Sequence, residues 1–200
     1  MEYLETLNQA LFLKLNASPD TPAWLICVAT TVANDLIFII PLLLLTMWLW
    51  GDNAQRNRAI KSSVVAFAGL VLSQLAGLVW QHPRPFAMGL GHAFLQHAPD
   101  SSFPSDHMTV FCSVGISLLF GRTLPWGAII LLCGLAVAWS RIALGVHFPL
   151  DMAGAVLVSG AAYALVTPVW AKAGDRITKI LVSLYRVFLA WPIGHGWIQR

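Results

Sequence analysis

Long apolar runs with little charge between them are the feature that most restricts how this chain can fold. Hydrophobic residues make up 58% of its 200 residues and charged residues only 10%, whereas soluble globular domains have about 45–50% and about 25%. A chain of this length leaves much of its side-chain surface uncovered when it folds, so that surface must face lipid. The composition excludes a soluble domain, and also excludes disordered, collagen-like and disulfide-stabilised chains.

Five of these runs are candidate transmembrane helices, because crossing a bilayer takes about 20 apolar residues. They are 23–50, 62–80, 107–120, 126–144 and 150–170. The first is interrupted by Asn34 and Asp35, which we expect to face the bundle interior, and the third is short for a span. The segments 3–15 and 177–189 have an apolar face and are expected to lie as amphipathic helices at the membrane interface. We therefore expect an all-α integral membrane bundle, with residues 1–200 forming a single membrane-embedded domain.

The Lys and Arg positions predict the orientation of the chain. Five spans put nine of the twelve basic residues on one side, namely Arg56, Arg58, Lys61, Arg122, Lys172, Arg176, Lys179, Arg186 and Arg200. The positive-inside rule assigns that side to the cytoplasm. The loop 81–106 and the segment 141–151 then face outward, which for a bacterial inner membrane is the periplasm. Because the basic residues are scattered between apolar runs, they do not indicate a nucleic-acid partner.

Six polar residues are concentrated on the outward side, although they lie far apart along the chain. They are Arg84, Ser105, His107, Arg141, His147 and Asp151. Ionisable groups at membrane depth are costly unless they share a polar cavity, so we expect the six to converge around one anion. Guanidinium groups, and a hydroxyl beside a helix N-terminus, suit phosphate oxygens. Histidines act as nucleophile, base or acid near neutral pH.

This set of residues suits phosphoryl transfer without a metal ion or other cofactor. The arginines would neutralise the phosphate oxygens, one histidine would attack phosphorus, and the other would protonate the leaving oxygen. A helix between His147 and Asp151 would put them on one face, but Pro149 favours a helix start or a tight turn there. Asp100, Asp106 and Asp151 are interleaved with cations, so they do not form the acidic cluster that holds Mg²⁺.

Three motifs resemble the signatures of the type 2 phosphatidic-acid phosphatase superfamily, which includes vanadium haloperoxidases and glucose-6-phosphatase. They are Arg84-Pro85, then Pro104-Ser105-Asp106-His107, then Ser140-Arg141 followed by His147 and Asp151. The resemblance implies that His147 forms a phosphohistidine, that Asp151 orients it, and that His107 is the general acid. It also implies that Arg84, Ser105 and Arg141 bind the phosphate.

Within the superfamily, the short chain and its Pro-Arg-Pro-Phe and Ser-Phe-Pro-Ser-Asp-His strings are similar to the bacitracin-resistance type of undecaprenyl pyrophosphate phosphatase. The usual Lys seven residues before Arg84 is replaced by Gly77, so phosphate binding either lacks that cation or is assisted by His82. The resemblance implies a polyprenyl pyrophosphate lipid as substrate. Its hydrolysis to undecaprenyl phosphate and inorganic phosphate would recycle the lipid carrier for cell-wall synthesis.

The motifs leave other activities open. The enzyme alternatives are a phosphatase acting on phosphatidylglycerol phosphate, phosphatidic acid or lipid A, and a lipid phosphotransferase. The non-enzymatic alternative is a membrane scaffold or transport subunit that kept the pattern. Histidines without motif support are interpreted as surface loop residues; these are His82, His92 and His97. Ser101, Ser102 and Asp106 either contact phosphate or shape the loop.

Overall fold

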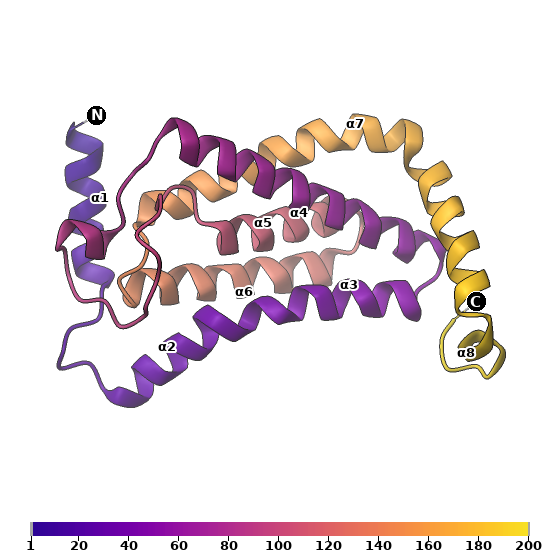
Figure 1. The fold of residues 1–200 in the computed structure, drawn as a ribbon, viewed down its shortest axis with the longest axis horizontal. Helices are drawn as coiled ribbons and strands as arrows, with labels where there is room; N and C mark the ends of the chain where they lie inside the picture. Colours follow the sequence, from indigo (N-terminus) through magenta and orange to yellow (C-terminus); the bar gives the residue numbers. More distant parts are fainter. Residues whose placement is uncertain (1, 200) are drawn as a thin grey trace.

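The computed structural model describes residues 2–199 and is helical through most of that range (Figure 1). Its elements are α1 (Glu2–Leu15), α2 (Ala23–Asp35), η1 (Leu36–Phe38), α3 (Ile39–Leu49), α4 (Asn53–Val79), η2 (Pro85–Met88), α5 (Asp106–Phe120), α6 (Leu124–Ala143), α7 (Pro149–Phe188) and α8 (Ala190–Gly194). Within the described range, four segments are long and apolar enough to cross a bilayer, and α5 is a shorter apolar helix. The predicted multi-pass helical bundle is confirmed.

The shortness of α5 is explained by its central position. Its 15 residues rise about 22 Å, less than the hydrocarbon thickness of about 30 Å. The helix packs against α4, α6 and α7, and its small polar side chains bond to these neighbours rather than facing lipid. Ser117 accepts a hydrogen bond from Ser62 at 3.0 Å, and Ser113 donates one to Ser159 at 3.1 Å. Such contacts are typical of helix interfaces inside membrane bundles.

The first apolar run folds as two helices, α2 and α3, joined by the 3₁₀ turn η1. Two small residues on the α2 face that packs towards the bundle, Ala29 and Ala33, are 2% and 0% exposed. Successive helical residues are rotated by about 100°, so Asn34 and Asp35, which follow Ala33, turn away from this contact. Both are exposed, and the expectation that they face the bundle interior is wrong.

The helix α7 joins two segments that the sequence suggested were separate. It has 40 residues and is about 60 Å long, so it extends beyond the bilayer. Its first part is the expected span 150–170, and its last part contains the expected interfacial helix 177–189. The helix bends in its second half (Figure 1). Pro168 lies inside it, and a proline removes one helical hydrogen bond and favours a bend.

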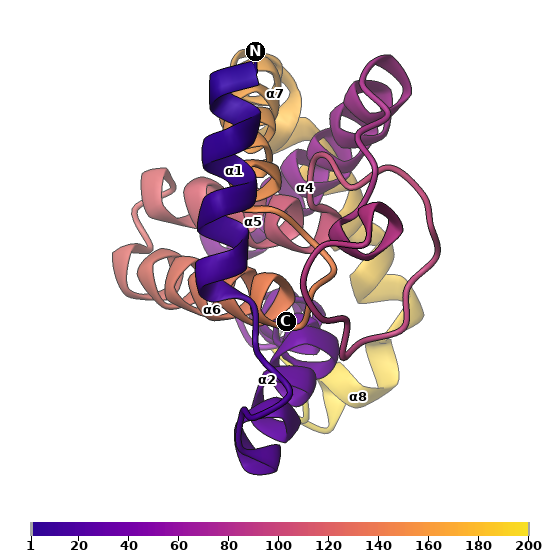
Figure 2. The ribbon, with the colours of Figure 1, turned by 90° about the vertical axis from the view of Figure 1, so that its left-hand side faces the viewer.

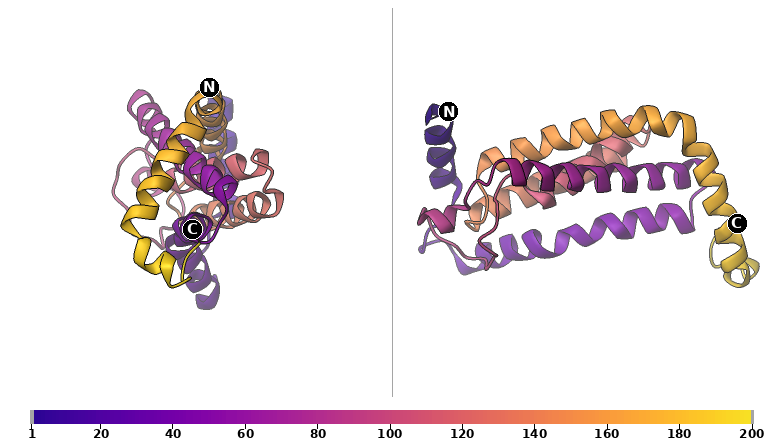
Figure 3. Two further views of the ribbon diagram at one scale, coloured as in Figure 1. Left: turned by 90° about the vertical axis from the view of Figure 1, so that its right-hand side faces the viewer. Right: turned by 45° about the horizontal axis from the view of Figure 1, so that its top comes forward.

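The two ends of the bundle carry different features. At one end α1 lies across the bundle axis, and at the other end the second part of α7 does so (Figure 3). The loop 81–105 covers the bundle end beside α1 (Figure 2). The basic residues that the sequence assigned to the cytoplasm belong to the opposite end, apart from Arg200, which lies outside the described residues. The polar motifs and most of the positive charge are therefore separated by the length of the bundle.

Candidate active site

The loop 81–105 and the adjoining helix ends enclose a cavity of about 600 Å³ at the α1 end of the bundle. Four of the six predicted site residues line it, namely Arg84, His107, Arg141 and His147. The other two, Ser105 and Asp151, are buried against these lining residues, with 0% and 1% of their surfaces exposed. The structure thus brings the six predicted residues together at one place.

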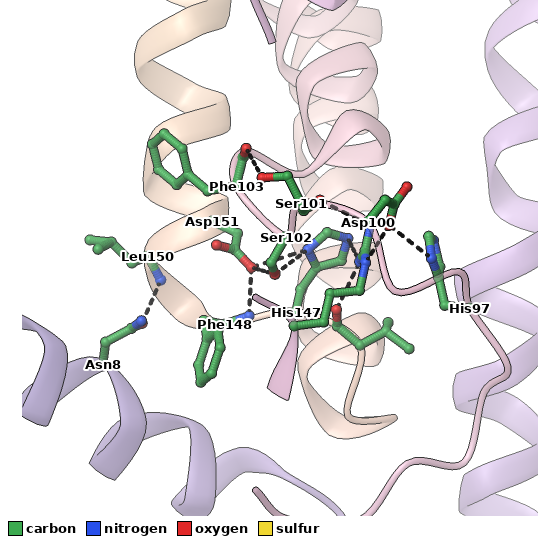
Figure 4. A network of polar contacts seen from close by, with 12 residues as sticks. Asn8, His97, Asp100, Ser101, Ser102, Phe103, His147, Phe148, Leu150 and Asp151 are labelled. Carbon is green, nitrogen blue, oxygen red and sulfur yellow. Dashed lines mark hydrogen bonds and ion pairs between the residues drawn. The ribbon is translucent and has the colours of Figure 1, made fainter. Parts of the chain in front are cut away.

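The start of α7 places His147 and Asp151 in contact. Pro149 is the first residue of the helix, so His147 lies in the preceding turn and Asp151 in the first helical turn. Asp151 Oδ2 lies 3.1 Å from His147 Nδ1 and accepts the backbone N–H of Phe148 at 2.7 Å (Figure 4). The helix therefore starts at Pro149, as the sequence favoured. His147 and Asp151 still make the contact that a continuous helix through both residues would have given.

Arg84 determines which nitrogen of His147 carries the proton. Its Nη1 lies 3.2 Å from His147 Nε2. A guanidinium group has only donors, so Nε2 is the acceptor in this contact and carries no proton. The proton is then on Nδ1, where it is donated to Asp151. This tautomer leaves Nε2 available for attack on phosphorus.

Burial controls the charge of the imidazole. His147 is 2% exposed. Loss of solvent lowers its pKa below the ordinary value of 6.5, the hydrogen bond with Asp151 partly opposes this, and the charge of Arg84 adds to the lowering. The ring is therefore neutral at pH 7, which is the form that a nucleophile requires.

Arg141 and Ser105 have buried polar atoms that no side chain or backbone group in residues 2–199 satisfies. Arg141 lies in the last turn of α6, and its Nη1 donates to the Ala33 carbonyl at 3.2 Å, while its Nε has no partner. Ser105 precedes α5, and its Oγ is also without a partner. Leaving such groups unpaired is costly. Arg141 lines the cavity, and Ser105 lies beside it. A phosphate bound in the cavity would therefore supply oxygen acceptors to both groups.

Ser102 belongs to the catalytic cluster although the sequence left its role open. Its side chain is fully buried, and its Oγ donates a short hydrogen bond to Asp151 Oδ2. The same Oγ lies 3.4 Å from His147 Nδ1. Ser102 therefore holds the carboxylate rather than a phosphate. Ser101 shapes the loop, since its Oγ donates to the backbone carbonyls of Trp80 and Phe103.

His97 differs from its interpretation as a surface loop residue. It lines the cavity, and its ring centroid is 6.3 Å from that of His147. Asp100 lies between His97 and Arg84: its Oδ1 accepts from Arg84 Nε at 2.8 Å and is 3.6 Å from His97 Nδ1. Burial, followed by the charge of Arg84, lowers the pKa of His97. Partial burial raises the pKa of Asp100, but the hydrogen bond from Arg84 and the charges of Arg84 and His97 together outweigh it and hold that pKa below its usual value.

Asp106 and His107 begin α5 with different roles. Asp106 accepts hydrogen bonds from two α4 side chains, Ser73 Oγ at 2.7 Å and Gln74 Nε2 at 2.9 Å. These bonds fix the start of α5 against α4, so Asp106 shapes the site. His107 is half-buried and lines the cavity. Over residues 2–199, no three His, Cys, Asp or Glu side chains are grouped as metal ligands, and the cations facing the cavity are arginines.

Gly77 lies in the cavity wall where the family pattern has a lysine. A Cβ at this position would lie 3.3 Å from the carbonyl oxygen of Phe103, so the loop packs closely on the α4 backbone. His82 also lines the cavity, but its Nε2 lies 3.3 Å from a carboxylate oxygen of Glu5 in α1. His82 is thus engaged with α1.

Comparison with known proteins identifies the family and the fold of the chain. The family model of the PAP2 superfamily matches residues 58–175. The provisionally named undecaprenyl-diphosphatase YbjG of Escherichia coli K12 is 40% identical over 196 residues, covering 98% of this chain and 99% of that protein. The undecaprenyl-diphosphatase BcrC of Bacillus subtilis 168 is 32% identical over 154 residues, covering 76% of this chain and 79% of that protein. The crystal structure of Aquifex aeolicus LpxE has the same fold, with a TM-score of 0.66, 23% identity, and coverage of 81% of this chain and 95% of LpxE.

Proposed function

The chain belongs to the PAP2 superfamily, and from this premise we propose that it hydrolyses undecaprenyl pyrophosphate to undecaprenyl phosphate and inorganic phosphate. The observation that carries the proposal is the buried His147–Asp151 pair, whose geometry leaves Nε2 of His147 unprotonated beside Arg84. The names of the two relatives, both undecaprenyl-diphosphatases, support the choice of substrate. Residues 1–200 would act as one membrane-embedded phosphatase domain.

The reaction proceeds in two steps. In the first, the Nε2 lone pair of His147 attacks the terminal phosphorus, the bond from phosphorus to the bridging oxygen breaks, and His107 protonates the departing undecaprenyl phosphate. In the second, His107 takes a proton from water as the water oxygen attacks phosphorus, the bond from phosphorus to Nε2 breaks, and neutral His147 and inorganic phosphate are released. Asp151 holds the Nδ1 proton throughout and stabilises the positive charge that develops on the ring.

Three groups bind the transferred phosphate. Arg84 Nη1 contacts Nε2 of His147 when no substrate is bound, so a phosphate oxygen would replace the imidazole as its acceptor. Arg141 offers its free Nε, and Ser105 its free Oγ. Their interactions strengthen as charge develops on the phosphoryl oxygens, which is how such groups lower the barrier.

The active site would face the periplasm from the inner membrane. The excess of basic residues at the opposite end of the bundle supports this orientation under the positive-inside rule. The pyrophosphate would lie in the cavity while the polyprenyl chain stays in lipid. Apolar contacts of this kind discriminate poorly between chain lengths, so the pyrophosphate group would provide most of the selectivity.

The decisive experiment measures phosphate release from undecaprenyl pyrophosphate by the purified protein in EDTA. We expect metal-independent turnover that His147→Ala and His147→Asn abolish. Loss of activity in EDTA with restoration by Mg²⁺ would overturn the metal-free mechanism. Turnover by a clean His147→Ala preparation would overturn the assignment of the nucleophile.

The same assay separates the alternatives. A higher rate with phosphatidylglycerol phosphate, phosphatidic acid or lipid A would reassign the substrate, and phosphate transfer to an added lipid acceptor would indicate a phosphotransferase. A scaffold or transport subunit predicts no phosphate release from any of these lipids and an unchanged cellular phenotype for His147→Ala.

A further inference from the structure

A second cavity lies at the opposite end of the bundle, between the first turns of α4 and the second part of α7. Its volume is about 730 Å³. The residues that line it are Asn53, Ala54, Asn57, Arg58, Asp175, Thr178, Lys179, Val182, Ser183, Arg186 and Val187. We refer to this cavity as the basic groove. The α7 residues in this set recur at helical spacing, so they form one face of that helix.

The basic groove carries an excess of positive charge, with three cations against one acid. Three of its side chains are cations, Arg58, Lys179 and Arg186, whereas Asp175 is the single acid. Within residues 2–199, none of the three cations forms an ion pair, since every ion pair in that range involves Arg84 or a histidine. Three like charges around one hollow repel each other, so the groove is suited to an anion.

Within residues 2–199, Asp175 is hydrogen-bonded to α4 and forms no ion pair with these cations. Asn57 Nδ2 donates to Asp175 Oδ1 at 3.3 Å and to Thr178 Oγ1 at 3.0 Å. Asn57 Oδ1 in turn accepts from the indole of Trp170 at 3.0 Å. This network joins α4 to α7 at one end of the groove and holds its walls at a fixed separation.

The position of the groove indicates what kind of anion would reach it. The second part of α7 lies across the bundle axis (Figure 3), as expected of a helix at the membrane surface. Next to the basic face is an exposed apolar face that includes Leu184 at 48%, Val187 at 70% and Phe188 at 80%. Cationic side chains beside apolar side chains at the membrane surface suit a molecule with an anionic headgroup and a hydrocarbon tail.

We propose that the basic groove binds the phosphate headgroup of an anionic phospholipid of the cytoplasmic leaflet, such as phosphatidylglycerol. Arg58, Lys179 and Arg186 contact the phosphodiester, and the acyl chains lie along Val187 and Phe188. Basic pockets beside membrane helices on the cytoplasmic side bind acidic lipids in this way. The inference does not depend on the phosphatase proposal, because the groove is at the other end of the bundle from His147.

The test compares two double variants that remove the same charge from the same part of α7. Lys179→Gln with Arg186→Gln neutralises two groove cations. Lys172→Gln with Arg176→Gln neutralises two exposed cations that do not line the groove. The purified proteins are titrated with mixed micelles of phosphatidylglycerol or phosphatidylcholine, and bound lipid is counted by native mass spectrometry alongside the thermal unfolding midpoint.

We expect the parent protein and the Lys172/Arg176 variant to bind phosphatidylglycerol in preference to phosphatidylcholine and to be stabilised by it. We expect the Lys179/Arg186 variant to bind it at least tenfold more weakly while unfolding at the parent temperature in phosphatidylcholine. Equal weakening in both variants would mean diffuse charge attraction and would overturn the proposal. Equal binding of the two lipids would also overturn it, as would full stabilisation by soluble glycerol 3-phosphate without lipid.

Discussion

Asp151 organises the candidate active site through a single carboxylate oxygen. Oδ2 accepts hydrogen bonds from Ser102 Oγ, His147 Nδ1 and the backbone N–H of Phe148. Three donors on one oxygen fix the direction of the carboxylate. The orientation of the nucleophile therefore depends on a residue that does not itself line the cavity.

Asp151→Asn should reduce turnover by roughly 10²–10⁴-fold. The amide can present its NH₂ group to His147, which would favour the tautomer with the proton on Nε2 and remove the attacking lone pair. Phosphate release from undecaprenyl pyrophosphate measures the effect. Ser102→Ala is a graded comparison, because it removes one hydrogen bond from Asp151 but leaves its charge, and we expect a smaller loss. A normal rate for Asp151→Asn would contradict the orienting role.

The pH dependence of the reaction should reflect burial of His147. The nucleophile must be neutral, and burial lowers its pKa below 6.5 while Asp151 opposes that lowering. Activity should therefore persist below pH 6.5 and fall only as pH decreases through the lowered pKa of His147. The measurement is kcat/KM against pH.

The fall in kcat/KM at low pH, its acid limb, could come from protonation of either His147 or the substrate. The Asp151→Asn variant distinguishes these two sources. Removing the carboxylate charge removes the contribution that raises the pKa of His147, so the limb should move to lower pH. Ionisation of the pyrophosphate is the same for both proteins. An acid limb at the same pH in both would assign it to the substrate instead.

The sequence predicted the site residues that belong to a motif. It did not predict the residues that hydrogen-bond to them. His147 and Asp151 are close in the chain, so their contact follows from local geometry around Pro149. Ser102 and Asp100 reach the site through the fold of the loop 81–105, whose path depends on packing against α4 and α7. No spacing rule distinguishes these two from other polar residues of a loop.

At the scale of elements, α1 supports the catalytic turn from outside the bundle. Asn8 is 4% exposed, and its Oδ1 accepts the Leu150 backbone N–H at 3.0 Å (Figure 4). Leu150 lies in the first turn of α7, where helical N–H groups have no partner within the helix. Phe12 packs edge-on against Phe148, with ring centroids 5.2 Å apart. The interfacial helix therefore acts as a cap for the helix that carries Asp151.

Asn8→Ala should destabilise the fold by about 1–2 kcal/mol, because it leaves a partly buried N–H without its partner at the start of α7. Turnover should fall with it, since the same turn positions Asp151. Thermal unfolding in detergent and phosphate release are the two measurements. Gln9→Ala is the matched control, as Gln9 bonds within α1 to Glu5 at 2.9 Å. If the two variants behave alike, Asn8 contributes no more than a surface residue.

The limits of the helices were harder to predict than the positions of the apolar spans. The apolar run of α5 predicted a helix, but only its burial between three neighbours explains how so short a helix fits a membrane bundle. Charged residues hid the continuity of α7, because Lys172, Asp175 and Arg176 interrupt the hydropathy pattern. Hydropathy detects what contacts lipid, and it does not show whether the backbone stays helical beyond the bilayer.

At the scale of the whole molecule, the fold separates two anion-attracting regions by the length of the bundle. The first is a cavity in which arginines surround a nucleophile, and the second is the basic groove between α4 and α7. The first would meet a pyrophosphate presented at the outer leaflet, and the second a phospholipid of the inner leaflet. Both proposals therefore require the same orientation of the chain in the membrane.

Site-directed labelling tests that orientation. In a background where Cys27, the exposed native cysteine, is replaced by alanine, Gln96→Cys puts a thiol in the exposed part of the loop 81–105 and Ala190→Cys puts one in α8. A membrane-impermeant maleimide should label the Gln96→Cys variant in intact cells whose outer membrane has been permeabilised. It should label the Ala190→Cys variant only after the inner membrane is disrupted. The reverse pattern would place the phosphatase cavity in the cytoplasm and the basic groove at the periplasmic surface, which would overturn both the positive-inside assignment and the leaflet proposed for the bound phospholipid.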